Sequence, residues 1–377
     1  MLERMIELRH YLHSNPDLPG EEEATAAFIN DILGKTEPDE LWTGVGGKGI
    51  VALYRGAKSG KVIGIRADMD GLPIVENTNL PYKSKKQGVS HSCGHDGHMA
   101  IILGIAEHLA QNRNELTGTI VLIFQPEEEL GTGAAKMLAD KRMQDLKFDT
   151  VLALHNLPGF KNNALIVRKG AFTSNTTGMI IRLWGATSHA GHPEDGNSPV
   201  MAMTAIINSL NTIPQMYIPV QNSALITIIH ARLGDRAFGT TPGYAHIMAT
   251  MRAYEAEDLE TMKSRAVFIT EGIAESYDLR CEIEWVEDYP AMINDDKLTD
   301  ELIAIGKRLD LPIIERAHPF SWSEDFSRFA ERSPGLLIGL GSGKDLPQLH
   351  NSNYDFPDDL LETGYNIFVE FIYRLNR

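Results

Sequence analysis

The stretch from His91 to His98 is dense in side chains that bind metals. Within it, Cys93 and His95 are separated only by Gly94, so a turn of the loop can direct both side chains at one ion. Thiolate and imidazole are the ligand types that zinc and the later divalent transition metals favour. A lone Cys-x-His is a weak signal, because cysteine is often simply buried and most histidines have ordinary polar roles. The interpretation as a metal site therefore depends on further ligands elsewhere in the chain.

Three other groups of polar side chains directly follow apolar runs that are typical of buried strands. The groups are Asp68 with Asp70 after residues 62–67, Glu127–Glu129 after residues 119–124, and His155 after residues 150–154. In an open α/β sheet, ligands bind in the crevice at the carboxyl ends of the strands. A run of acidic residues is usually a solvated surface, but this triplet follows a core strand and a proline. We therefore expect these groups and the Cys93 loop to converge on one metal site.

The apolar patterns predict an α/β domain that would position these groups. Residues 119–124 are nearly all apolar, as in strands that are buried on both faces. The apolar run from Met99 to Ala106 predicts a helix that begins beside the Cys93 loop. Further strands are expected at residues 51–54 and 335–340, and further helices within 1–34 and at 133–140, 296–309 and 358–375. This alternation is typical of a sheet flanked by helices.

The pattern changes after about residue 172. Expected strands and helices there follow the order β-α-β-β-α-β, at residues 179–184, 198–212, 224–229, 246–252, 257–277 and 281–286. That order is typical of a ferredoxin-like α+β sandwich. We predict a discontinuous catalytic domain, residues 1–171 and 289–377, and an inserted domain, residues 172–288, for which the family resemblance given below implies a lid or dimerisation role.

Size and composition restrict the class of protein. A chain of 377 residues is longer than one core usually serves, and its formal charge of −16 offers no basic face for nucleic acid or an anionic membrane. Only Cys93 and Cys281 are present, which excludes a disulfide framework and favours a reducing compartment. Residues 1–9 lack the pattern of a signal peptide, and no apolar run reaches membrane-spanning length. We therefore expect a cytoplasmic protein.

Eight short stretches that follow one another along nearly the whole chain carry a family resemblance. They are Leu12-His13 with Pro16, Arg66–Ile74, Ser92–His98, Phe124–Glu129, Ala153–His155, Gly185–Pro193, Ser323–Phe326 and Leu349–Asn351. In these stretches the chain resembles the M20 metallopeptidase/amidohydrolase family, in particular the subfamily of hippurate hydrolases, N-acyl-amino-acid deacylases and auxin-conjugate hydrolases. The resemblance implies a mixed, largely parallel sheet flanked by helices, as in di-metal exopeptidases, with the inserted ferredoxin-like domain.

The resemblance also implies two divalent metal ions per subunit, with Mn, Zn, Ni and Co as the candidates. The implied ligands are Cys93, His95, Glu129, His155 and His350. Glu128 would be the general base that deprotonates a metal-bridging water. The wider clan has His-x-Asp at residues 68–70, and Cys93 supplies the replacement ligand. Asp70 then matches a carboxylate that supports the catalytic site from behind the ligands, and Asp68 need not be a ligand.

Two residues of the inserted domain receive roles from the same resemblance. His189 matches a histidine that stabilises the tetrahedral oxyanion and that the partner subunit often delivers, which implies a homodimer. Arg252 matches an arginine that can bind an anionic group of the substrate, although a surface salt bridge is an equally general role. The chain departs from the family at residues 238–243, where Gly239 replaces the usual asparagine of an Asn-Val-Ile-Pro stretch. This departure leaves recognition of the substrate carboxylate open.

The sequence thus predicts a metal-dependent amidohydrolase that cleaves the amide of N-acyl amino acids or similar small conjugates. One alternative is an exopeptidase of the dipeptidase or carboxypeptidase type. Another is a metal-binding protein without catalysis, against which Glu128 and His189 argue because they accompany the full ligand set. In each case we expect a small-molecule ligand rather than nucleic acid or a membrane.

Overall fold

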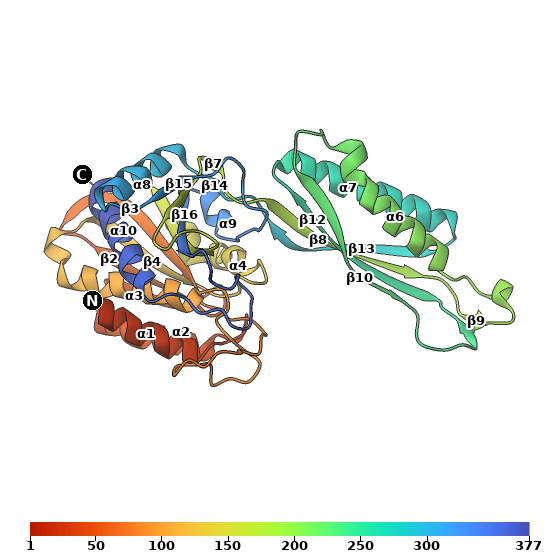
Figure 1. The fold of residues 1–377 in the computed structure, drawn as a ribbon, viewed down its shortest axis with the longest axis horizontal. Coiled ribbons are helices and arrows are strands. Elements are labelled where there is room, and N and C mark those ends of the chain that lie inside the picture. The colour runs from red at the N-terminus through yellow and green to blue at the C-terminus, as the bar shows by residue number, and fades with distance from the viewer. Residues whose placement is uncertain (377) are drawn as a thin grey trace. The chain divides into compact units, whose positions relative to one another are not determined.

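A computed structural model describes residues 1–376, which form two compact units (Figure 1). The first unit contains Met1–Phe172, Met292–His318 and the chain from Glu324 onward, and the second contains Thr173–Ala291 and Pro319–Ser323. The longer excursion of the chain leaves and re-enters the first unit at one place, where the backbone N of Phe172 donates to the O of Met292 at 2.7 Å. The domain limits of 171/172 and 288/289 stay predictions.

The short segment Pro319–Ser323 was not assigned to the inserted domain from sequence. It belongs to the second unit because hydrogen bonds attach it to the strand that begins at Asn175. Ser174 Oγ donates to Ser321 O at 2.9 Å, and the hydroxyls of Thr176 and Ser323 lie 2.5 Å apart. These bonds join residues that are about 150 positions apart in sequence, so no local pattern reveals them.

The first unit is built on an eight-stranded sheet in the order β1-β2-β4-β3-β5-β16-β6-β15. The strands are β1 (Glu40–Val45), β2 (Gly49–Arg55), β3 (Lys58–Asp68), β4 (Thr117–Gln125), β5 (Thr150–Pro158), β6 (Leu165–Val167), β15 (Ile313–Glu315) and β16 (Gly335–Gly343). The four adjacent strands β4, β3, β5 and β16 are parallel, while β2 runs antiparallel to β4 and β6 runs antiparallel to β16. The predicted mixed, largely parallel sheet is confirmed.

Helices cover this sheet on both faces. The large core contains residues from α1 (Leu2–Ser14), α2 (Glu23–Lys35), α3 (His95–Gln111), α8 (Asp296–Arg308) and α10 (Asp359–Leu375). Alternate residues of β4, such as Ile120 and Leu122, belong to this core. Their neighbours Val121 and Ile123 are also buried, but they do not belong to it. Both α3 and α4 contact β4, so the predicted burial of this strand on both faces is confirmed.

The remaining elements of the first unit are short. They are the 3-10 helix Arg113–Glu115, α4 (Gly133–Ala139), α5 (Lys141–Asp145), α9 (Ser327–Ala330), and the two-residue strands β7 (Gly170–Ala171) and β14 (Ile293–Asn294), which pair with each other. No helix within residues 1–376 has the length and apolar character needed to cross a membrane.

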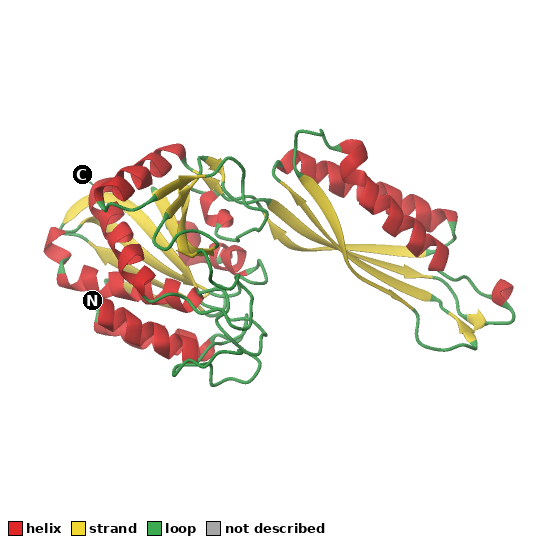
Figure 2. Ribbon diagram, in the orientation of Figure 1, coloured by secondary structure: helices red, strands yellow, loops and turns green. Residues whose placement is uncertain are grey.

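The second unit has a four-stranded antiparallel sheet with both helices on one face (Figure 2). Its elements are β8 (Asn175–Trp184), α6 (Val200–Tyr217), β10 (Ala224–Leu233), β12 (Tyr244–Ala253), α7 (Ala256–Ser276) and β13 (Arg280–Tyr289). The sheet order β10-β12-β8-β13 is that of a ferredoxin-like sandwich, as predicted. A loop extension carries β9 (Ser188–His189), the 3-10 helix Pro193–Asp195 and β11 (Thr240–Thr241), and β9 pairs with β11.

The strand that carries His155 is longer than the sequence indicated. We expected His155 to follow a strand that ends at residue 154, but β5 continues to Pro158. Its pairing with β3 ends at Ala153, whereas its pairing with β16 continues through His155, which lies opposite Gly339. The partner strand on one side therefore extends β5, and His155 projects from the strand itself.

Candidate metal centre

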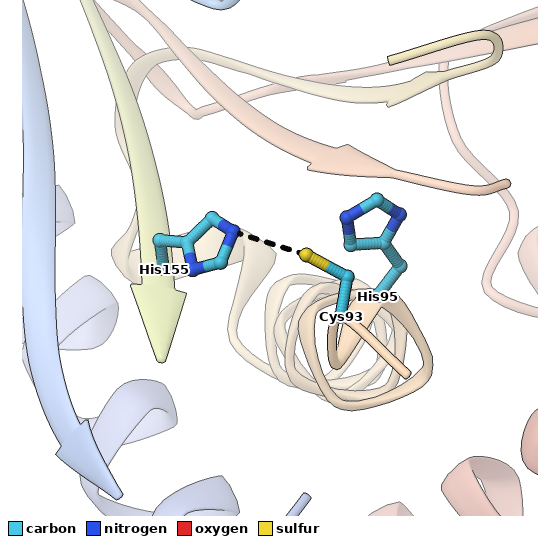
Figure 3. Close-up of side chains that lie close together, drawn as sticks. All are labelled: Cys93, His95 and His155. Atoms are coloured by element: carbon cyan, nitrogen blue, oxygen red, sulfur yellow. Dashed lines mark hydrogen bonds between the residues drawn. The ribbon is translucent and has the colours of Figure 1, made fainter. Parts of the chain in front are cut away.

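Cys93 and His155 meet at the carboxyl end of the parallel strands. The Sγ atom of Cys93 lies 3.6 Å from Nε2 of His155, and both side chains are buried. Figure 3 shows the sulfur pointing from the start of α3 toward the ring on β5, with the ring of His95 on the other side of the thiol. A ligand atom from each of these three residues lies within 4.8 Å of the other two.

Gly94 allows the loop to make this turn. It is the N-cap of α3 and has φ of 98°, a left-handed conformation that favours glycine. A Cβ atom at this position would lie 2.5 Å from Oδ1 of Asn156, which is too close. The glycine between Cys93 and His95 is therefore required by both backbone conformation and space.

The acidic residues after β4 join the same cluster. Nε2 of His95 lies 4.0 Å from Oε2 of Glu128 and 3.9 Å from Oε1 of Glu129, and Nε2 of His350 lies 3.3 Å from the same Glu129 oxygen. His95, Glu128 and Glu129 form one group of potential ligands, and Cys93, Glu129 and His350 form another. His350 differs from the rest because half of its side chain is exposed. The structure thus brings together all five predicted ligands and the predicted base, while their roles stay predictions.

Asp70 lies behind this cluster and holds three of its members. Its carboxylate accepts hydrogen bonds from the backbone N of Glu128 at 3.2 Å and of Glu129 at 3.0 Å. Its backbone O accepts from Nδ1 of His95 at 2.8 Å, which leaves Nε2 of that ring facing the cluster. Hydrogen bonds of this kind orient metal ligands in many proteins. Asp70 therefore has the position expected of a supporting carboxylate.

Asp68 is engaged on both of its oxygens. It accepts from Nη1 of Arg66 at 2.7 Å and lies 2.7 Å from Nδ1 of His98. Nη2 of Arg66 also donates to Glu324 at 3.0 Å and to Asp325 at 3.1 Å, and all these groups are buried. We did not single out this network from sequence. Its signal was an arginine inside an otherwise apolar strand, because a buried guanidinium requires several acceptors.

Burial and like charges shift the pKa values of the cluster. Burial, together with the carboxylates of Glu129 and Glu128, raises the pKa of the Cys93 thiol well above its usual range. Burial and the nearby Glu324 and Glu129 raise the pKa of Glu128 in the same way. Burial lowers the pKa of His155 to about 3, so this ring is neutral, as a metal ligand must be. A bound cation would favour the anionic forms of the thiol and the carboxylates that their mutual repulsion disfavours.

The atoms that face the centre of the cluster fit a divalent metal. Nε2 of His95 and Oε1 of Glu129 are buried and have no hydrogen-bond partner among residues 1–376. Buried polar atoms are rarely left in that state unless a water or an ion satisfies them. Sulfur, imidazole nitrogen and carboxylate oxygen together form a donor set that suits divalent transition metals.

His189 and Arg252 belong to the second unit. His189 is exposed on β9, and its Nδ1 accepts a hydrogen bond from the backbone N of Gly191 at 3.0 Å. In the neutral ring the proton is therefore on Nε2, which can donate. Nη1 of Arg252 donates to Thr176 Oγ1 at 3.0 Å and to Ser321 O at 2.8 Å, and burial lowers the pKa of this guanidinium. Gly239 lies in open space, since a Cβ atom there would meet nothing within 4 Å.

Comparison with known protein families gives a match to the peptidase family M20/M25/M40 over residues 64–374. The chain belongs to this family. The resemblance inferred from the motifs is thereby confirmed, and the M20 protein described here is a metal-dependent amidohydrolase.

Several relatives of known or proposed activity are similar over nearly the whole chain. The hippurate hydrolase of Campylobacter jejuni is 35% identical over 366 residues, covering 96% of this chain and 94% of that protein. The N-acetyl-L-cysteine deacetylase of Bacillus subtilis is 32% identical, covering 91% and 81%. Thermostable carboxypeptidase 1 of Saccharolobus solfataricus is also 32% identical, covering 96% and 92%.

Solved structures agree with this family. A protein from methicillin resistant Staphylococcus aureus matches with a TM-score of 0.90 and 27% identity, covering 100% of this chain and 97% of that chain. The Bacillus subtilis YXEP protein, a dinuclear metal binding peptidase from the M20 family, matches with a TM-score of 0.83 and 28% identity, covering 99% and 98%. The donor set around Cys93 and the M20 fold thus point to divalent metal binding.

Proposed function

We propose that this protein hydrolyses the amide bond of N-acyl amino acids or similar small conjugates. The observation that carries the proposal is the convergence of Cys93, His95, Glu129, His155 and His350 on one place beside Glu128. Relatives named for hippurate and for N-acetyl-L-cysteine support this substrate class, since both names denote N-acylated amino acids.

Two divalent ions per subunit fit the arrangement of the ligand groups. One group comprises Cys93, His95 and His155, and the other comprises Cys93, Glu129 and His350, so the thiolate is available to both ions. Thiolate and imidazole favour Zn, Co and Ni, while the carboxylates also admit Mn. When bound, the ions would polarise the substrate carbonyl and lower the pKa of a coordinated water.

Glu128 is the general base of the proposed reaction. It accepts a proton from the attacking water and transfers it to the departing amine, since its carboxylate lies beside the proposed ligands His95 and Glu129. Asp70 holds the backbone N atoms of Glu128 and Glu129, which fixes the direction in which each carboxylate leaves the chain. The two neighbouring acids can therefore divide the roles of base and ligand.

His189 donates to the oxyanion of the tetrahedral intermediate. Its Nδ1 is occupied by Gly191, so Nε2 is the donor, as this role requires. In the proposed homodimer this donor is His189 of the partner subunit. Arg252 binds the carboxylate of the amino-acid product.

Exposed apolar residues of the second unit favour a dimer of two copies. The strand β10 is an edge of its sheet and exposes Leu225 and Ile229, and α6 exposes Met201, Met216 and Tyr217. An open apolar edge strand is normally covered by a partner. Replacement of Ile229 by lysine should convert the dimer to a monomer in light scattering, and a wild-type monomer would contradict the dimer.

A cytoplasmic location fits this chemistry. Cys93 is a free thiol in the structure and must remain reduced to act as a ligand. A reducing compartment preserves that state without further protection.

One other activity is favoured by a specific observation. The similarity to thermostable carboxypeptidase 1 supports an exopeptidase of the dipeptidase or carboxypeptidase type as the second candidate. A protein that binds metal without catalysis is the third candidate, and the position of Glu128 beside the ligands argues against it.

The deciding experiment compares these candidates directly. The protein loaded with Mn, Zn, Co or Ni is assayed on N-benzoyl and N-acetyl amino acids and on dipeptides of the same carboxyl-terminal residue. We expect kcat/KM to be higher on the N-acyl compounds. Higher values on dipeptides would support the exopeptidase, and tight metal binding without turnover on either panel would support the non-catalytic protein.

A further inference from the structure

Asn156 is a fully buried residue that no part of the proposed reaction uses. Its Nδ2 donates to the backbone O of Cys93 at 3.1 Å and to Oη of Tyr354 at 2.5 Å. Its Oδ1 lies 2.6 Å from Nε2 of His98. Its own backbone O accepts from Nδ1 of His155 at 2.9 Å. One residue therefore contacts the thiol loop, the first turns of α3 and the ligand on β5.

The side chain of Asn156 is one link in a chain of buried hydrogen bonds that begins at Arg66. Arg66 holds Asp68 at 2.7 Å, Asp68 holds Nδ1 of His98 at 2.7 Å, and the other nitrogen of that ring meets Asn156. Each of these side chains is at most 3% exposed. Because every link is buried and made at hydrogen-bond distance, the position of the amide is set from β3 as well as from β5.

The carbonyl that Asn156 holds controls the direction of the thiol. Cys93 lies outside any helix or strand, and the next residue, Gly94, has a left-handed conformation and no side chain that could hold the loop in place. The neighbouring Ser92 is held through its O by the backbone N of His350. The amide of Asn156 therefore fixes the backbone carbonyl of Cys93 itself. The orientation of that peptide group sets the direction in which the Cys93 side chain leaves the loop.

We propose that Asn156 is a positioning residue that sets the Cys93 sulfur relative to the imidazole of His155. The inference rests on the proposed function, since it takes Cys93 and His155 as metal ligands. The same residue orients the ring through its backbone and the thiol loop through its side chain, so the two ligands share one reference point. Groups that orient ligands in this way determine metal affinity strongly.

Only an amide meets all the contacts at this position. Cys93 O can only accept, so it requires a donor, while Nε2 of His98 faces the oxygen of Asn156. Aspartate is nearly identical in shape but would place an oxygen against the carbonyl of Cys93. The backbone bond to His155 survives any side-chain replacement, so a variant disturbs the thiol and leaves the imidazole in place.

The test compares Asn156→Asp with Asn294→Asp. Asn294 is a matched control in the same unit: it is 2% exposed, its Nδ2 donates to Arg168 O and Leu337 O, and its Oδ1 accepts from Leu337 N. For each protein we would measure the Kd of Co²⁺ by chelator competition, the thiolate-to-Co²⁺ charge-transfer band, the unfolding midpoint, and kcat and KM.

We expect both variants to unfold at lower temperature, but only Asn156→Asp to bind Co²⁺ about 10- to 100-fold more weakly, with a reduced thiolate band. Its kcat should fall more than its KM changes, because the substrate contacts are elsewhere. If the aspartate variant does not fold, Asn156→Ala, which removes the side-chain donor without adding charge, is judged by the same measurements.

Three results would overturn the inference, and they are distinguishable. An Asn156 variant with wild-type Kd and thiolate band would refute the positioning role and leave the ligand assignment intact. A wild-type protein without a thiolate band, or one whose band persists in Cys93→Ser, would refute the ligand assignment and the inference together. Equal loss of Co²⁺ affinity in Asn294→Asp would reduce Asn156 to a residue that only stabilises the fold.

Discussion

Nδ1 of His13 lies 2.9 Å from Oδ2 of Asp96, and neither side chain has any exposed surface. Nη1 of Arg9 contacts the same carboxylate oxygen at 3.1 Å. Asp96 directly follows His95, so this buried cluster attaches α1 to the turn of α3 that carries a predicted ligand. The amino-terminal helix thereby supports the metal centre without contributing a ligand to it.

The first prediction concerns stability and pH. Burial by itself would lower the pKa of His13, but Asp96 and Glu76 together outweigh burial and raise it from 6.5 to about 9. A raised folded-state pKa means that the charged ring stabilises the fold fully below pH 6.5 and that this contribution is lost as the pH rises through about 9. The loss should approach about 3 kcal/mol of unfolding free energy at most.

This effect can be measured by denaturant unfolding at pH 6 and pH 9.5 with a chelator present. His13→Gln should be much less stable than wild type at pH 6, and the difference should shrink at pH 9.5. His318→Gln, which changes an exposed histidine, serves as the control. A difference between wild type and His13→Gln that does not vary with pH would contradict the prediction.

The second prediction concerns the base. Glu128→Gln should retain the metal and lose about 10²- to 10⁴-fold in kcat, as expected when a general acid–base group is removed. Metal content and kcat are measured on the same preparation. Glu127→Gln is the neighbouring control. The Glu127 carboxylate pairs with Lys136 and accepts a hydrogen bond from Thr132, so its replacement should leave kcat within a few-fold of wild type. Equal turnover in Glu128→Gln and wild type would exclude Glu128 as the base.

The third prediction concerns metal removal. Since the ligands repel one another without a cation, saturating Zn²⁺ or Mn²⁺ at about 100 times Kd should add about 2.7 kcal/mol per bound ion to the free energy of unfolding. Cys93→Ser should lose most of that gain, whereas Cys281→Ser, in the second unit, should keep it. The measurement is unfolding with and without a chelator. A wild-type protein that a chelator leaves unchanged would argue against the metal centre.

The fourth prediction concerns Gly94. Gly94→Ala should destabilise the protein by about 1–3 kcal/mol, because it forces a side chain into a left-handed conformation and into contact with Asn156. Gly34→Ala is the matched control: it lies in α2 with nothing within 4 Å of a new Cβ, and should be neutral or stabilising by up to about 1 kcal/mol. Wild-type stability of Gly94→Ala in thermal unfolding would show that the loop can relax.

The sequence was sufficient to predict the central strands and the long helices, because each of them contains an apolar pattern long enough to distinguish a strand from a helix. It did not reveal β6 or β15, which have three residues each and exist because β16 and their mutual pairing hold them. The extension of β5 beyond residue 154 has the same cause, since β16 continues to pair with it.

Most of the metal centre could be predicted because the residues that follow strands carry unusual chemistry. The supporting contacts could not. The bond from the backbone of Glu128 to Asp70 spans 58 positions in sequence, and the bond from Asn156 to Cys93 spans 63. Asp70 stood out only through the family resemblance, and Asn156 did not stand out at all, because neither contact exists until the tertiary structure places a specific donor opposite a specific acceptor.

The hydrogen bond between Phe172 and Met292, beside the paired strands β7 and β14, has a consequence for how such a protein can change. Because the two ends of the insertion are held together there, the residues between them can be lengthened, shortened or replaced with little disturbance to the sheet of the larger unit. Outside that insertion, only the five residues Pro319–Ser323 would need to adapt. Selectivity for new substrates can therefore be acquired by exchanging a module, while the ion-binding chemistry is inherited intact.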